Sequence, residues 1–404
     1  MQDEAVQKKI VSTWHANKYI HTFLNLTVKS HKEPGEVSCR NLHSSVQNKL
    51  TGASKFLSKY LKDKASSLYH LVKNSTDLKR RIDAIRPEST DQFTTIDVKD
   101  FFMSGSAPDI STWCADFIDN SEEAHTIKKF VNFLLDSQFV RSHSLDASYK
   151  VVAGTGMGLN HSGEVADVAF YQRCERHLLA STEFHNRVRL YCRFKDDIFV
   201  ISRGPMGNTY DILDRNSGPF KLKVESCGRS VDVLELHIEH ARDRYRITPR
   251  QRCTALVEPP LHISSGHHES INMNWPVQHL KHRLDLCTHD ADRAAEVEFF
   301  RSKFSKHLAP PQLLEKLIDK STERAPAARA SNPVWFVLGY LPQWQWGQLS
   351  ASCRRMSSDS RMCGLWRIAF KDLSPTPDIS ISWCNQLPSL ARPVQYSNMR
   401  KVGR

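Results

Sequence analysis

The stretch that decides the fold is RLYCRFKDDIFVI, residues 189–201. Two β-prone runs, 189–194 and 198–201, flank the adjacent acids Asp196 and Asp197, so the pattern predicts a hairpin with both carboxylates at its tip. Paired aspartates are common on protein surfaces and usually have no function there. Apolar strands flank this pair on both sides, however, and charges in such surroundings must be compensated. We therefore interpret Asp196 and Asp197 as functional residues.

A second β-prone run ends at a third acid. Residues 93–98, FTTIDV, place Asp97 at the end of a predicted buried strand, followed by Phe101 and Phe102. Adjacent acids on a hairpin and one acid on a neighbouring strand can surround one point with three carboxylates. Such hard oxygen ligands suit Mg²⁺, and two ions about 4 Å apart can activate a hydroxyl and neutralise a leaving pyrophosphate. The strand pattern therefore predicts three carboxylates close together, an arrangement that could hold the metal ions of nucleotidyl transfer.

Periodic segments on either side of these runs predict a mixed α/β fold. Apolar residues recur at helical spacing within 44–85, 120–134, 165–179 and 290–318, the last interrupted by two prolines. β-prone runs predict two strands within 28–42 and further strands over 220–224, 231–238 and 245–248. Glycines at 154, 156 and 158 predict a flexible loop ahead of the helix at 165–179.

Length and charge bound the class of protein. A chain of 404 residues exceeds one ordinary domain and predicts two or three structural units. Lysine and arginine number 56 against 44 acids, a net charge of +12, which favours a polyanionic partner such as nucleic acid. A basic protein without such a partner is the alternative. Ten cysteines stand without any C-x-x-C pair, which argues against a structural zinc site.

The sequence also bears on location. Residues 1–9 are polar and charged, and no stretch of about 18 apolar residues occurs. It therefore predicts no signal peptide, no transmembrane segment and no membrane partner. We expect an intracellular protein, in the nucleus or the cytoplasm, with reduced thiols.

The motifs and their order resemble those of reverse transcriptases. Asp97–Phe102, DVKDFF, resembles the first palm motif, Gly156–Gly158 with the following helix resembles the second, and Phe194–Asp197, FKDD, resembles the aromatic-x-Asp-Asp box. The resemblance covers about residues 20–320. Within that class, residues 261–283 are similar to the region before the thumb in Penelope-like retroelements.

The resemblance implies a metal-binding role for four residues. Asp97 and Asp196 would be the principal metal ligands, with Asp197 as the third acid and the Val98 carbonyl as a backbone ligand. The implied cofactor is Mg²⁺, with Mn²⁺ as the alternative.

Other matching positions would meet the incoming nucleotide. Lys29 or Lys32, together with Arg40, would contact its triphosphate, because point-charge lysine and forked arginine suit phosphate oxygens. A solvated hairpin face is the alternative for these three. Phe102 would lie under the sugar and exclude a 2′ hydroxyl, unless it is a core aromatic.

The glycine loop and a later strand complete the implied site. Gly156 and Gly158 would let the loop approach template and nucleotide closely, and an ordinary glycine turn is the alternative. Lys221 or Lys223 would approach the phosphates late in the cycle, or else face solvent on a strand.

The implied activity is that of an RNA-directed DNA polymerase of a retroelement, with an RNA template, a DNA primer and dNTPs as partners. An RNA-templated RNA polymerase is the nearest enzymatic rival. Two departures from the family pattern, Leu159-Asn160-His161 after the second motif and Glu235 where aspartate is usual, keep a further alternative open. That alternative is a catalytically inactive reverse-transcriptase relic that acts as a nucleic-acid-binding or F-box-type adaptor protein.

The domain organisation follows from the same resemblance. It implies an α/β (α+β) right-hand polymerase with partial fingers over 1–92, a palm with an antiparallel sheet over 93–250, and the palm end with a helical thumb over 251–324. Residues 325–333 read as a linker. Residues 334–404 hold five of the eight tryptophans, and the segments 336–342, 349–355 and 365–367 are similar to an F-box. This implies a small C-terminal α module that docks onto a ubiquitin-ligase scaffold, the alternative being a hydrophobic tail.

Overall fold

The computed structural model describes residues 4–28, 39–142, 147–241, 244–250, 266–267, 269–305, 311–322, 334–339, 366–371 and 399–401. The chain divides into two units, which are described separately. The first comprises Met1–Val257, Asp285–Arg293 and Gln395–Arg404, and the second comprises Glu258–Leu284 and Ala294–Val394.

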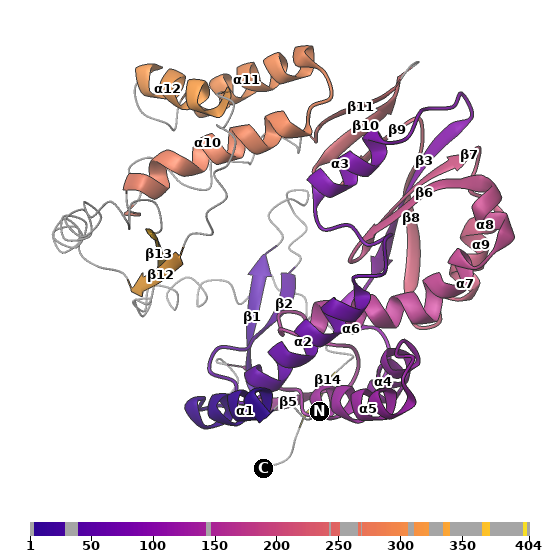
Figure 1. The fold of residues 1–404 in the computed structure, drawn as a ribbon, viewed down its shortest axis with the longest axis vertical. Helices are drawn as coiled ribbons and strands as arrows, with labels where there is room; N and C mark the ends of the chain where they lie inside the picture. The colour runs from indigo at the N-terminus through magenta and orange to yellow at the C-terminus, as the bar shows by residue number, and fades with distance from the viewer. Residues whose placement is uncertain are drawn as a thin grey trace, which may run out of the picture. The chain divides into compact units, whose positions relative to one another are not determined.

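The first unit is built on a four-stranded antiparallel sheet with the strand order β6-β7-β3-β8 (Figure 1). These strands span Val188–Phe194, Asp197–Arg203, Asp91–Lys99 and Lys221–Gly228. β6 and β7 form the predicted hairpin, and β3 and β8 overlap the predicted strands 93–98 and 220–224. The prediction of a mixed α/β fold with an antiparallel sheet is confirmed.

Both faces of this sheet are covered, which explains the continuous apolar run in β7. Ile198 and Val200 belong to a hydrophobic cluster with residues of the helices α6–α9, whereas Phe199 and Ile201 belong to a second cluster with residues of α3 and β9–β11. Side chains alternate between the two faces of a strand, so an uninterrupted apolar sequence buries both faces. The helices concerned are α3 (Ser75–Asp83), α6 (Ser162–Phe170), α7 (Arg176–Leu179), α8 (Thr182–Arg187) and α9 (Asn208–Arg215).

A three-stranded antiparallel sheet consists of β9 (Ser230–Val233), β10 (Leu236–His240) and β11 (Tyr245–Pro249). The prediction of one strand over 231–238 is wrong, because the chain turns at Leu234, whose φ is 52°. In one straight strand, Val231 and Val233 would face away from Leu236 and Ile238. The turn brings all four side chains into the same hydrophobic cluster.

The predicted helix over 165–179 begins earlier and is not uniform. α6 starts at Ser162, a π-helical turn covers Tyr171–Glu175, and α7 follows. Such π turns are rare and are frequently found at functional sites. The periodicity of apolar residues does not reveal this one, because Cys174 and Leu178 continue the buried face through it.

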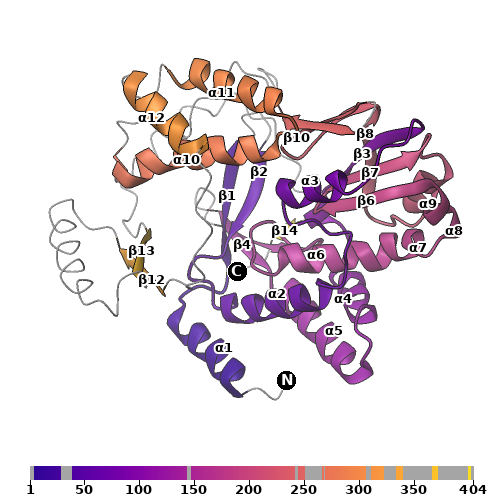
Figure 2. The same cartoon turned by 45° about the horizontal axis from the view of Figure 1, so that its top comes forward.

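Four further helices of the first unit are α1 (Glu4–Ala16), α2 (Thr51–Ala65), α4 (Ala107–Asp116) and α5 (Ser121–Asp136). α2 and α3 are the two helices predicted within 44–85. Leu57, Ile110, Val131 and Val165 belong to one cluster that joins α2, α4 and α5 to α6 (Figure 2). The Asn120 side chain caps α5 by accepting from the Glu123 N–H at 2.9 Å.

A second sheet of the first unit has the order β14-β5-β4-β1-β2. Its strands are β1 (Thr22–Val28), β2 (Cys39–Ser44), β4 (Phe139–Ser142), β5 (Ala147–Val151) and β14 (Met399–Lys401). β1 and β2 pair antiparallel. β2 overlaps the second strand predicted within 28–42, whereas β1 ends at Val28, where that segment begins, and residues 29–38 lie outside the described residues.

The second unit contains a helical cluster. Residues of α10 (Glu269–Leu286), α11 (Asp290–Phe304) and α12 (Pro311–Thr322) pack together through Val277, Leu280, Phe300 and Leu317. α11 and α12 are the helical pair predicted over 290–318, and Pro311 is the first residue of α12. In the part of the chain that the structure describes, no helix is long and apolar enough to cross a membrane.

The described parts of 334–404 are strands, where the F-box resemblance implied helices. β12 (Val334–Gly339) pairs in parallel with β13 (Trp366–Lys371). Both are rich in β-branched and aromatic residues, which fit a pleated sheet better than a helix. The F-box-like segments at 349–355 and at Leu365, and the part of 336–342 after Gly339, lie outside the described residues.

Candidate active site

The structure brings the three predicted acids to one end of the central sheet. Asp97 on β3 lies directly opposite Asp197 on β7. Asp196 occupies the two-residue turn between β6 and β7, and its carbonyl accepts a hydrogen bond from the Val98 N–H at 2.9 Å. The turn is tight because Lys195 adopts a left-handed conformation with φ 53°. Two neighbouring strands and one turn thus present all three carboxylates.

The electrostatics of Asp197 reflect this arrangement. Its carboxyl is partly buried, and burial together with repulsion from Asp196, Asp97 and Glu225 raises its pKa from 3.8 to about 7. Arg250 opposes the shift. The raised pKa thus reflects the burial of this carboxyl first and the neighbouring acids second.

The donor set fits a hard divalent cation. Among the described residues, no group of three or more His, Cys, Asp or Glu side chains is already gathered tightly enough to hold an ion. The acids are nevertheless all oxygen donors, and their mutual repulsion is what a bound cation would relieve. Asp97, Asp196 and Asp197, with the carbonyl of Val98, are the residues that would hold it.

Asp197 makes the stability of the metal-free chain depend on pH. The folded chain keeps a proton on this carboxyl up to about pH 7, whereas the unfolded chain releases it near pH 4. Because the folded state binds more protons in this window, the contribution of Asp197 to the free energy of unfolding falls as pH rises from 4 to 7. In EDTA, Asp197→Asn is expected to raise the melting temperature at pH 8 and to leave it nearly unchanged at pH 4. A pH-independent effect in thermal denaturation would contradict the assigned shift.

The glycine loop packs against the segment that follows β3. The Thr155 N–H donates to the Phe102 carbonyl at 2.7 Å, and His43 N–H donates to the Met157 carbonyl at 2.7 Å. Gly156 and Gly158 have φ of 72° and 100°. A Cβ on Gly156 would lie 2.6 Å from the His43 ring, and one on Gly158 would lie 3.0 Å from the His43 carbonyl oxygen. Close packing of the loop on β2 therefore requires both glycines, whatever they contact in a complex.

Phe102 and its neighbour Phe101 have different environments. Phe101 is buried in the core, whereas Phe102 is only partly buried and packs edge-on against it, with ring centroids 5.2 Å apart. Phe102 is the second residue of a short 3-10 helix, η1 (Phe101–Met103), which follows the strand that carries Asp97. Phe102 thus remains partly exposed directly after the strand that carries Asp97.

The structure describes only some of the basic residues predicted to contact the nucleotide. Arg40 is exposed on β2, and Lys29 and Lys32 lie outside the described residues. On β8, Lys223 lies directly opposite Asp97, whereas Lys221 lies opposite Lys99. Of the two lysines named from the sequence, Lys223 is therefore the one adjacent to the acids.

A pocket of about 390 Å³ adjoins Asp197 on one side of the hairpin. Glu235, the residue that departs from the family pattern, lines it and accepts a hydrogen bond from the Ser75 hydroxyl at 3.1 Å. The remaining lining residues are Asn74, Ser75, Thr95, Ile96, Phe194, Ile198, Glu225, Asp232, Val233, Leu234 and Arg250. The pocket extends the acidic surroundings of Asp197 toward β9.

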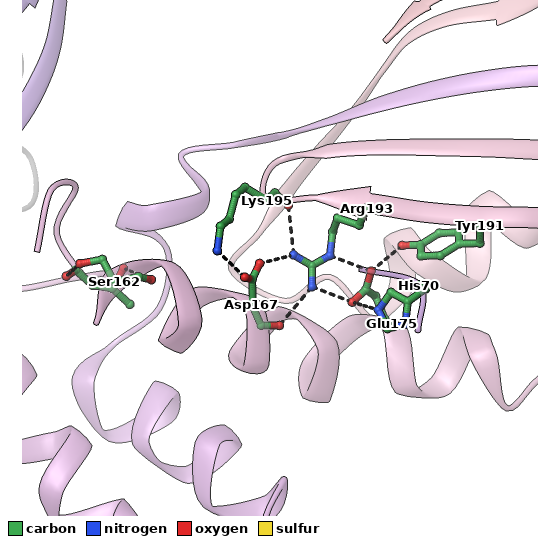
Figure 3. A network of polar contacts seen from close by, with 8 residues as sticks. His70, Ser162, Asp167, Glu175, Tyr191, Arg193 and Lys195 are labelled. Atoms are coloured by element: carbon green, nitrogen blue, oxygen red, sulfur yellow. Dashed lines mark hydrogen bonds and ion pairs between the residues drawn. The ribbon is translucent and has the colours of Figure 1, made fainter. Parts of the chain in front are cut away.

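A buried ionic network beneath the turn was not predicted from the sequence. Arg193 on β6 is fully buried and pairs with Glu175 and Asp167 of the helical segment (Figure 3). Burial alone would raise the pKa of Glu175, but Arg193 and His70 outweigh it and hold that pKa well below its usual range. An arginine inside the apolar run 189–194 was the signal that could have revealed the network, although not its partners.

No family model and no curated protein matches the chain. Among solved structures, it is similar to telomerase from Candida albicans in complex with a TWJ fragment of telomeric RNA (TM-score 0.48, 13% identity, 79% of this chain and 62% of that chain). It is also similar to apo telomerase from Candida tropicalis (TM-score 0.44, 10% identity, 79% and 66%). A third is the RNA-dependent RNA polymerase of a human picobirnavirus (TM-score 0.48, 9% identity, 74% and 59%). The chain spans less than two thirds of each of these proteins.

Proposed function

We propose that the chain is a template-directed nucleotidyltransferase, specifically an RNA-directed DNA polymerase of retroelement type. The observation that carries the proposal is the meeting of Asp97, Asp196 and Asp197 at one end of an antiparallel sheet, where burial first and repulsion from the other two acids second raise the pKa of Asp197. A surplus of 12 positive charges over the whole chain suits nucleic-acid partners. The partners proposed are an RNA template, a DNA primer and dNTPs. The assignment of residues 1–92 to fingers, 93–250 to palm and 251–324 to palm end and thumb is part of the same proposal.

In the proposed mechanism, the chain's own acidic residues would hold the metal ions and its basic residues would bind the phosphates. Bound Mg²⁺, or Mn²⁺, would supply activation of the primer hydroxyl and neutralisation of the leaving pyrophosphate. Asp97 and Asp197 lie on a sheet that is packed on both faces, and Asp196 lies in the turn beside it, which favours a preorganised set of charges. Lys223, across from Asp97, can offset negative charge on the phosphates, and Arg40 with Lys29 or Lys32 would bind the triphosphate.

The test is primer extension by the full chain with Mg²⁺. RNA and DNA templates are each offered with dNTPs or with NTPs, and product length is measured on denaturing gels. The proposal expects extension on RNA with dNTPs. Extension with NTPs alone would favour the RNA-templated RNA polymerase. Absence of extension under Mg²⁺ and Mn²⁺, with retained RNA binding in a gel-shift assay, would favour the inactive relic.

Sugar selection provides a more specific test of Phe102. If the ring of Phe102 lies under the sugar, Phe102→Ala removes the obstacle to a 2′ hydroxyl, and incorporation of NTPs relative to dNTPs should rise at least about tenfold, the rate equivalent of 1.4 kcal/mol. Single-nucleotide incorporation rates measure the ratio. Trp113→Ala, at another partly buried aromatic packed on the same cluster, is the control for loss of packing. Equal ratios in the two variants would remove Phe102 from sugar selection.

A further inference from the structure

Every N–H donor of the Arg193 guanidinium is used inside the protein (Figure 3). Nε donates to Glu175 Oε1 at 2.8 Å, and Nη2 donates to Glu175 Oε2 at 2.9 Å and to the Asp167 carbonyl at 3.1 Å. Nη1 donates to Asp167 Oδ1 at 2.8 Å and to the Lys195 carbonyl at 3.1 Å. One side chain thus joins the helical segment to the backbone of the turn that carries Asp196.

Lys195 makes a second connection between the same elements. Its Nζ lies 2.5 Å from Asp167 Oδ2, on the helix that follows the glycine loop. Gly163, also on α6, leaves room for it, since a Cβ there would lie 2.9 Å from Nζ. Asp167 therefore holds both the arginine below the turn and the lysine within it.

Two further side chains, those of Tyr191 and His70, contact the Glu175 carboxylate. The Tyr191 hydroxyl donates to Glu175 Oε1 at 2.9 Å, and His70 Nε2 lies 3.0 Å from Oε2. Glu175 is the last residue of the π turn and is fully buried. Buried ion pairs often contribute little net stability compared with apolar packing, because desolvation of the charges is costly. Their best-supported benefit is geometric, since a planar guanidinium fixes its partners in direction as well as distance.

We propose that Arg193 is a positioning residue that, together with Asp167 and Glu175, sets the backbone of the Lys195–Asp197 turn and thereby the placement of the metal-binding carboxylates. This inference rests on the proposed function for its kinetic consequence. The turn is held from two directions: by Arg193 at the Lys195 carbonyl and by the Val98 N–H at the Asp196 carbonyl. Removing the first contact takes away the tie between Arg193 and the turn, while the Lys195–Asp167 ion pair and the strand pairing on either side remain.

The chain offers a matched control on the same strand. Arg189, near the other end of β6, pairs at 2.5 Å with the fully buried Asp91. It is the same residue type and also pairs with a buried acid, although it is only partly buried, and it bonds no backbone group of the turn. Arg193→Lys removes the planar guanidinium near the turn, and Asp167→Asn removes a negative charge there. Arg189→Lys and Asp91→Asn make the same two changes away from the turn.

Three measurements on the full chain test the proposal. Mn²⁺ titration by calorimetry reports metal affinity, primer extension separates kcat from the KM for dNTP, and amide hydrogen exchange reports order at Lys195–Asp197. For Arg193→Lys and Asp167→Asn, metal affinity and kcat are expected to fall about ten- to a hundredfold, the usual effect of losing an outer-shell partner. Exchange at the turn should accelerate, and the KM should change less than kcat. Arg189→Lys and Asp91→Asn should lower the melting temperature without these changes.

The outcomes separate the two proposals. Equal losses in the Arg193 and Arg189 variants would mean that Arg193 acts only through general stability, and the inference would be overturned. If Arg193→Lys does not fold, Asp167→Asn decides by the same comparison with Asp91→Asn. A wild-type chain that neither binds Mn²⁺ nor extends a primer would refute the proposed function instead. In that case, unchanged exchange at the turn in Arg193→Lys would still refute the positioning role.

Discussion

Asp196→Asn is expected to reduce primer extension about a thousandfold or more. Charge stabilisation by bound metal contributes several kcal/mol to such reactions, and each 1.4 kcal/mol is a factor of ten in rate. Asparagine keeps the size of the side chain but loses the negative charge that a divalent ion requires. The loss should appear in single-turnover rates at saturating primer, template and dNTP.

The stability of the Asp196→Asn variant separates chemistry from misfolding. Asp196 contributes to the repulsion that raises the pKa of Asp197, so removing its charge should not lower the melting temperature in EDTA. Asp119→Asn, an exposed acid ahead of α5, is the control and should extend primers like the wild type. Extension by Asp196→Asn within tenfold of the wild-type rate would show that this carboxylate is not a metal ligand.

Gly154→Ala is expected to destabilise the fold by about 3 kcal/mol or more. Gly154 has φ 80°, and a Cβ there would lie 2.3 Å from Met103 Cα and 2.4 Å from the Phe102 carbonyl oxygen. Both are backbone atoms, so the overlap cannot be relieved by rotating a side chain. Either the glycine loop or the segment after Asp97 must move.

Gly204→Ala isolates the cost of the backbone angle alone. Its φ is 76°, close to that of Gly154, but nothing lies within 4 Å of its Cβ position. This variant should lose only about 1 to 2 kcal/mol, the cost of a left-handed conformation for an L residue. Urea denaturation of both variants measures the difference. Equal losses at the two positions would mean that the loop accommodates the extra carbon.

Local patterns predicted much of the central sheet. β6, β7 and the end of β3 were predictable because each is a short continuous run of β-prone residues next to an acid. Treating those runs as neighbouring strands predicted that Asp97 lies near the hairpin acids, and the strand register then places it opposite Asp197. The strand error at 231–238 was avoidable in principle, because Val233 and Leu236 have opposite parity and cannot share one face of a straight strand.

Other features depend on contacts that no local pattern records. The amino-acid sequence by itself determined where the acids lie along the chain, which strands carry them and where glycine is needed, because β-propensity and backbone freedom are properties of single residues and their immediate neighbours. Only the tertiary structure decided that Arg193 meets Asp167, 26 residues away, and Glu175, 18 residues away, and that Lys223 rather than Lys221 lies across from Asp97. Pairing partners and strand register arise when distant segments pack, since many charged partners satisfy a buried arginine equally well until the fold brings one of them within hydrogen-bond distance.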